Sequence, residues 1–176
     1  QEFVLEAFGG EVFELPAGVT TSFNITFGVG MVFAMVAASA IGVLLTPYPA
    51  RGLLMAACIV GAMSFGVLSF AAVAGARNAL LTTIFVLGVA KGLYNVGIAH
   101  LFMSLAESRT AGMLMGAWGA FGGFAVALGG LSGGVFRDLA EHLSGNVALS
   151  YGVVFGIEVF GLLAAAALIS RLPRPS

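Results

Sequence analysis

The stretch GLLMAACIVGAMSFGVLSFAAVAGA, residues 52–76, contains no charged residue. A bilayer core of about 30 Å needs about 20 apolar helical residues to cross it, so this stretch predicts a transmembrane helix. Two further runs without charge cover 15–50 and 110–136, and the runs 78–106 and 143–170 are each interrupted by a single charged residue. Trimmed at turn signals, these runs predict five spans: 20–46, 53–74, 79–103, 112–135 and 148–170.

The composition excludes most other classes of protein. Of 176 residues, 60% are hydrophobic and 9% are charged, against about 25% charged in an average soluble domain. A net charge of -1 without a basic stripe excludes nucleic-acid binding as a main role. The single cysteine, Cys58, excludes a disulfide scaffold and a CxxC metal site. Because strand-like alternation is absent, we expect an all-α membrane protein without a bound metal.

The charged residues outside the spans orient the predicted bundle. Arginines dominate one side, which the positive-inside rule makes cytoplasmic: Arg51, Arg109, Arg171 and Arg174. The other side combines two arginines with most of the acids: Arg77, Arg137, Glu6, Glu11, Glu14, Asp138 and Glu141. The C-terminus is therefore expected in the cytoplasm and residues 1–19 outside. The loop 137–146 is expected to hold a short interfacial helix.

Residues 1–19 combine four glutamates with several large apolar side chains. The glutamates prevent this stretch from crossing lipid as an independent helix, yet it is too apolar for a plain tail. It is typical of the end of a helix whose body lies upstream. We therefore expect the chain to be the C-terminal part of a longer protein.

The local sequence of Leu5–Phe13, LEAFGGEVF, resembles the "LEPFGGEVF" signature of the PucC/LhaA family. Further similarity is spread along the chain, at Thr20-Thr21, Ala111-Gly112, Gly116–Ala120, Arg137-Asp138 and Tyr151–Glu158. Two departures are that Ala7 stands where the family has proline, and that no histidine follows Gly92-Leu93-Tyr94. Members are facilitator-like proteins of phototrophic bacteria, implicated in light-harvesting complex assembly and in handling bacteriochlorophyll.

This resemblance implies a fold, a location and a function. The fold would be the C-terminal half of a twelve-helix major facilitator bundle, with residues 1–176 as one transmembrane domain that packs on the N-terminal half. The location would be the bacterial inner or intracytoplasmic photosynthetic membrane. The function would be that of a non-enzymatic assembly factor that binds or delivers bacteriochlorophyll or chlorophyll, or chaperones light-harvesting polypeptides. A secondary transporter of a small solute or ion is the alternative; a pigment-modifying enzyme lacks any catalytic constellation.

Two ionisable residues fall near the middle of predicted spans: Lys91 in 79–103 and Glu158 in 148–170. Buried charges in lipid are costly unless they are paired or hydrated, so we expect both to face one cavity. They form either an ion pair that fixes helix packing or a polar binding site at half depth. Asn95 lies one helical turn after Lys91 and is expected to extend this site.

His100 and Trp118 are the candidate pigment contacts. His100 lies on the helix face opposite Lys91, among Val89, Leu93, Val96 and Met103. Its imidazole could serve as an axial ligand of chlorophyll magnesium, or it could lie at the interface bonded to water or a headgroup. Trp118 would line a cavity or pigment surface, or simply pack.

Two glycine-containing motifs complete the candidate sites. A small-residue ridge, formed by Gly112, Gly116, Gly119 and Gly123, allows close helix approach. It serves either packing within the chain or docking of a single-span partner. At the exterior rim, Gly9-Gly10-Glu11 is either a solvated acidic loop or a structural or gating element.

Overall fold

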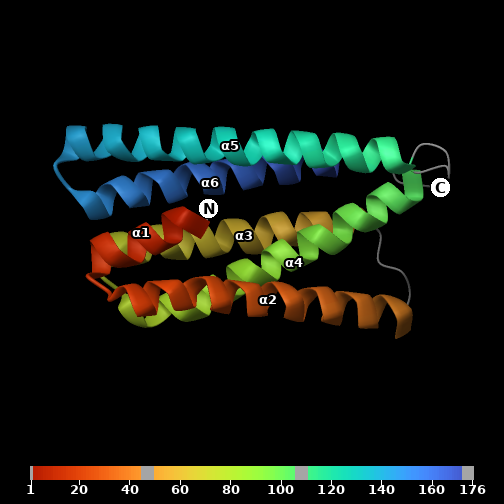
Figure 1. Cartoon of the computed structure of the whole chain (residues 1–176), viewed down its shortest axis with the longest axis horizontal. Helices are drawn as coiled ribbons and strands as arrows, with labels where there is room; N and C mark the ends of the chain where they lie inside the picture. Colours follow the sequence, from red (N-terminus) through yellow and green to blue (C-terminus); the bar gives the residue numbers. More distant parts are fainter. Residues whose placement is uncertain (1, 45–49, 106–110, 172–176) are drawn as a thin grey trace.

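The computed structural model describes residues 2–44, 50–105 and 111–171, which form helices and no strand (Figure 1). The long helices run side by side along one axis (Figure 1). In chain order the elements are α1 (Glu2–Phe13), α2 (Ala17–Leu44), α3 (Ala50–Ala74), the 3-10 turn η1 (Arg77–Ala79), α4 (Leu80–Leu105), α5 (Ala111–Ser144) and α6 (Val147–Ser170).

The helices α2 to α6 correspond to the five predicted spans, and each is long and apolar enough to cross a membrane. The predicted all-α membrane fold is therefore confirmed, and the chain is a multi-pass membrane protein. The amino-terminal stretch is also helical, as expected, but α1 has only 12 residues. It begins near the middle of the bundle and ends where α2 begins (Figure 1). The twelve-helix arrangement stays a prediction.

Helix ends follow the turn residues in the sequence. Glu14 takes a positive φ of 53° after α1, and the backbone N–H of Val19 donates to the Pro16 carbonyl at 2.8 Å as α2 starts. Pro16 lacks an N–H, so it suits the beginning of a helix and not its interior. Gly75, with φ of 68°, follows the end of α3, where glycine tolerates the left-handed backbone.

The predicted end of the fourth span at residue 135 was wrong. No separate interfacial helix occupies 137–146, because α5 continues unbroken to Ser144. No proline or glycine interrupts 135–144, and Arg137 pairs with Glu141 one turn later at 3.3 Å. The helix stops at Gly145, whose φ is 62°, and Asn146 then caps α6 by accepting from the Leu149 N–H at 3.1 Å.

The buried apolar core joins α1 to α2, α3, α4 and α6, and among the described residues it includes none from α5. Phe8 of α1 is fully buried and lies at its centre. The ring centroid of Phe8 is 5.3 Å from Phe13, 5.3 Å from Tyr151 and 5.0 Å from Phe155. Such tilted and edge-on aromatic contacts are favourable, so the short α1 is firmly held against α6.

Glycines bring α2 and α4 into backbone contact. A Cβ placed on Gly30 would collide with the carbonyl of Phe85, and one on Gly88 would collide with the carbonyl of Phe27. A Cβ on Gly92 would lie 2.7 Å from that of Ala34. Small residues allow this close approach, in which van der Waals packing holds membrane helices together.

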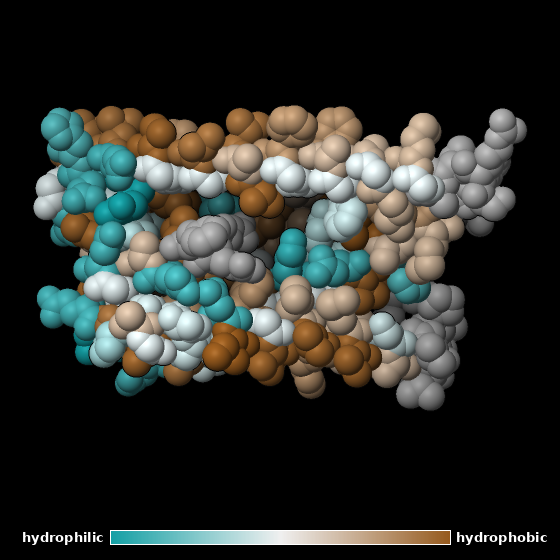
Figure 2. All heavy atoms as spheres, in the orientation of Figure 1, coloured by the Kyte–Doolittle hydropathy of each residue, from teal (hydrophilic) through white to brown (hydrophobic). Residues whose placement is uncertain are grey.

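Described charged residues lie at both ends of the bundle, while Arg109 and Arg174, which were expected at the cytoplasmic end, lie outside the described residues. At one end Arg77 donates to the Phe13 carbonyl and Arg137 pairs with Glu11. At the other end Arg51 donates to the Ser170 carbonyl. Figure 2 shows hydrophilic residues gathered at the first end, at its left side. Which end faces the cytoplasm stays a prediction.

Candidate functional site

Lys91 of α4 and Glu158 of α6 line the same cavity, whose volume is about 490 Å³. Figure 2 shows the molecule hollowed below α5, which runs along its upper edge. The remaining described lining is apolar, with three phenylalanines and three glycines among its members: Val4, Phe27, Phe65, Ala125, Val126, Gly129, Gly130, Gly133, Val154 and Phe155. The cavity therefore combines one cationic and one anionic side chain with aromatic and backbone surface.

One contact of Lys91 comes from its own helix. Its ammonium nitrogen lies 5.0 Å from the ring centroid of Tyr94, a distance at which a ring face attracts a cation. Asn95 does not share this cavity lining as far as the described residues show. Its side-chain amide donates to the Met31 sulfur of α2 at 3.6 Å. The structure thus brings Lys91 and Glu158 to one cavity and places Asn95 at the α2–α4 contact.

His100 of α4 and Trp118 of α5 lie on neighbouring helices, but it is Phe102 of α4 that contacts Trp118. The ring of Phe102, two residues after His100, lies 6.0 Å from the Trp118 ring at 67°. Positions two apart on a helix point to nearly opposite sides, so this contact does not include His100. His100 is half-buried, while on its face Val96 is buried and Met103 is exposed. Trp118 is 39% exposed.

The cavity offers aromatic and backbone surface, and no histidine is among the described residues of its lining. Phe27, Phe65 and Phe155 offer aromatic surface, and glycines of α5 offer bare backbone. His100 is not among the described residues of the lining. Nor do the described residues contain a group of three or more His, Cys, Asp or Glu side chains that could hold a metal ion. Any axial ligation by His100 would therefore occur outside this cavity.

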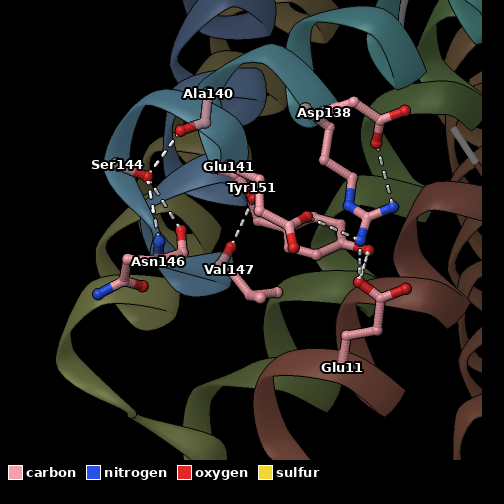
Figure 3. A network of polar contacts seen from close by, with 10 residues as sticks. Glu11, Asp138, Ala140, Glu141, Ser144, Asn146, Val147 and Tyr151 are labelled. Carbon is pink, nitrogen blue, oxygen red and sulfur yellow. Dashed lines mark hydrogen bonds and ion pairs between the residues drawn. The ribbon is translucent and has the colours of Figure 1, made fainter.

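A polar cluster joins α1, α5 and α6 at the end of the bundle where the acids gather (Figure 3). Arg137 pairs with Glu11 and also reaches Glu141, and its guanidinium lies 5.1 Å from the ring centroid of Tyr151. The Tyr151 hydroxyl donates to the same Glu11 carboxylate at 3.0 Å. Because Tyr151 is 1% exposed, this cluster has one side in the core and the other in water.

In the motif Gly9-Gly10-Glu11, Gly9 packs against α2 and Glu11 makes the charged contacts. Gly9 is buried, and a Cβ there would lie 2.5 Å from the Phe23 ring and 2.9 Å from the Thr20 methyl of α2. Gly10 meets nothing within 4 Å. Glu11 carries the contacts to Arg137 and Tyr151. The exterior motif is therefore part of a helix that is bound on both sides, and it is not a solvated loop.

The glycine ridge of α5 makes no close packing contact with another described part of the chain. A Cβ added at Gly112, Gly116, Gly119 or Gly123 would meet nothing within 4 Å. The apolar window of α5 has no buried residue. The structure therefore does not show the ridge packing against another described helix. Docking of a single-span partner stays a prediction.

Sequence reasoning placed Arg137, Glu11 and Glu141 at the same end of the bundle but did not pair them. It missed Tyr151 as a polar residue, because a tyrosine in an apolar run is usually a core side chain. The available signal was an arginine directly after an uncharged run, which needs a carboxylate at the same depth. Glu11 provides that carboxylate.

The comparisons with known proteins agree with the resemblance. A family model described as PUCC protein matches residues 1–176. The chain is 31% identical to Protein PucC of Cereibacter sphaeroides over 98% of its own length. It is 30% identical over 94% of its length to a Rhodobacter capsulatus protein named bacteriochlorophyll synthase 44.5 kDa chain. It is 27% identical over 99% of its length to an uncharacterized protein in the puhA-bchM intergenic region of the same organism.

The chain spans only part of these relatives, 38% of the PucC and the intergenic-region protein and 39% of the synthase chain. No solved structure matches it. The match of the family model extends over every described helix, the cavity that they line and the polar cluster at one end of the bundle. This chain therefore belongs to the PUCC protein family.

Proposed function

We propose that this chain is part of a membrane assembly factor for photosynthetic light-harvesting complexes. The observation that carries the proposal is the family match over the whole chain, supported by a relative whose name refers to bacteriochlorophyll. The factor would bind or deliver bacteriochlorophyll or chlorophyll, or chaperone antenna polypeptides during insertion. It would act without catalysing a reaction, in the inner or intracytoplasmic photosynthetic membrane, with its C-terminus in the cytoplasm.

Two features of the structure suit this role. The cavity of about 490 Å³ has the aromatic and glycine surfaces that a flat, apolar pigment needs. Helix α5 is long, and its exposed face is apolar and contains glycines that leave its backbone accessible. A single-span polypeptide could pack against such a surface as membrane helices pack against one another.

The test is purification of the tagged full-length protein from a phototrophic host, beside an unrelated multi-pass protein with the same tag. Absorbance spectra and mass spectrometry of the purified material identify bound pigment and antenna polypeptides. We expect either or both to be enriched over the control. Full-length protein that carries neither above the control level would refute the assembly role.

A secondary transporter of a small solute or ion is the second candidate, and Lys91 and Glu158 in one cavity favour it. Half-depth charged groups are typical of transport pathways. Reconstitution of the full-length protein in liposomes tests this function. Solute uptake that is lost in both Lys91→Gln and Glu158→Gln would support transport, and uptake equal to that of empty liposomes would count against it.

A further inference from the structure

The lining of the Lys91/Glu158 cavity restricts what can bind there. All six helices contribute to it. Phenylalanines from α2, α3 and α6 supply aromatic rings: Phe27, Phe65 and Phe155. The α5 wall supplies small side chains and bare backbone, from Ala125 to Gly133. Rings and a smooth backbone wall favour a flat apolar body over a branched or hydrated one.

The α5 wall has room for a ligand at the peptide backbone itself. A Cβ added to Gly129, Gly130 or Gly133 would meet nothing within 4 Å. In contrast to the glycines between α2 and α4, these glycines do not accommodate a neighbouring helix of the described chain. Their absent side chains therefore widen the cavity, and one leucine there would occupy part of it.

Lys91 sets the polar end of the site. The residue is exposed despite its position in the middle of α4. Its ammonium group makes a cation–π contact with the Tyr94 ring. An ammonium in a mostly apolar cavity at half depth attracts an anion far more strongly than it would in water. A carboxylate is a singly charged anion that an apolar ligand can carry there, and the ion pair with Lys91 would offset part of the several kcal/mol that its desolvation costs.

We propose that this cavity binds a flat, aromatic carboxylate, with its ring body between the phenylalanines and the α5 glycines and its carboxylate on Lys91. A neutral ester of the same body would lose the ion pair with Lys91. This deepens the proposed function and rests on its assignment of a flat ligand to this cavity, because it adds the chemical class of that ligand.

The experiment uses the full-length protein in lipid nanodiscs, with 1-pyrenebutyrate and its methyl ester as probes. Fluorescence anisotropy is measured against empty nanodiscs, which subtracts partition into lipid. We expect saturable binding of the acid with at least tenfold higher affinity than the ester. Lys91→Gln should remove this preference, and Lys91→Arg, which keeps the positive charge, should retain it.

Shape is tested separately with a matched pair of glycine variants. Gly130→Leu places a side chain in the cavity, and Gly119→Leu places the same side chain on α5 outside the described lining. Neither added Cβ meets a neighbour, so both variants should fold. We expect at least a tenfold loss of acid binding in Gly130→Leu and wild-type binding in Gly119→Leu.

Three results would overturn the proposal: equal binding of acid and ester, a preference for the acid that survives Lys91→Gln, or equal binding in the two leucine variants. None of these depends on co-purified pigment or antenna polypeptides. Failure of the ligand proposal therefore remains distinguishable from failure of the assembly role. Conversely, a preparation free of native pigment can still show the preference for the acid in nanodiscs.

Discussion

Glycines in α2 and α4 and glycines in α5 have the same side chain but opposite surroundings. Gly30, Gly88 and Gly92 hold two helix backbones in contact, and a Cβ at any of them meets atoms of the other helix. The α5 ridge, such as Gly116 and Gly119, meets nothing within 4 Å. The difference shows that glycine content alone does not identify a packing interface. The interface needs a partner at the same level, which α2 and α4 provide for each other.

The α2–α4 pair and α5 also differ in the contacts that attach them to the rest of the bundle. The α2–α4 pair belongs to the part of the bundle with the buried aromatic core. Helix α5 spans 34 residues, about 51 Å at 1.5 Å per residue, and contributes nothing to that core among the described residues. One of its described attachments to the rest of the bundle is the polar cluster of Arg137 with Glu11. Hence α5 forms a wall of the Lys91/Glu158 cavity that lies outside the buried aromatic core.

The largest effect is expected from Gly30→Ala, with Gly28→Ala as its matched control on the same helix. The added methyl of Gly30→Ala meets the Phe85 carbonyl of α4, whereas that of Gly28→Ala meets nothing within 4 Å. Overpacking against backbone should cost about 1–3 kcal/mol or more, and Gly28→Ala should be neutral or stabilise by up to about 1 kcal/mol. Thermal unfolding of the full-length protein in detergent measures both. Equal melting temperatures would show that α2 and α4 are not in backbone contact.

The next largest effect is expected in the polar cluster, because its ion pair should hold the C-terminal end of α5 against α1 and α6. Arg137→Gln removes the pair with Glu11 and the contact with the Tyr151 ring. We expect a loss of about 1–2 kcal/mol, since a charged hydrogen bond that is partly shielded from water is worth about that amount. Asp138→Asn is the control, because the Asp138 side chain is 76% exposed and such surface pairs contribute little.

A double-mutant cycle of Arg137→Gln with Glu11→Gln separates the pair from the rest of the cluster. A coupling free energy of about 1 kcal/mol is expected, in the range of partly exposed ion pairs within a network. The unfolding free energies of the wild type, both single variants and the double variant give this value. Additive effects would mean that Arg137 and Glu11 stabilise the bundle independently and do not anchor α5 to α1.

The number of spans could be predicted because it depends on long runs of uncharged residues. The placement of charged residues at the ends could be predicted because moving a charged side chain into lipid is costly. The end of α5 could not be predicted, since residues 137–144 suit both a loop and a continued helix; in the structure they form a helix that includes the Arg137–Glu141 pair and stops at Gly145. Gly30 was not identified as a contact, because a single sequence does not show that it lies against the backbone of Phe85 and Val89. Lys91 and Glu158 could be placed in one cavity by depth, but Asn95 could not be separated from them until α2 was located.

The smallest effect on stability is expected from the double variant Gly116→Ala with Gly119→Ala on α5. Its added methyl groups meet nothing in the described chain, and alanine favours helix over glycine by about 0.5–1 kcal/mol per site. The melting temperature should therefore stay the same or rise slightly, in contrast to Gly30→Ala. If the ridge instead packs a separate helical partner, the same variant should reduce the antenna polypeptide that co-purifies with the full-length protein by several-fold. Unchanged stability together with unchanged co-purification would leave the ridge without a packing role, and a lower melting temperature would place it against another segment of the same protein.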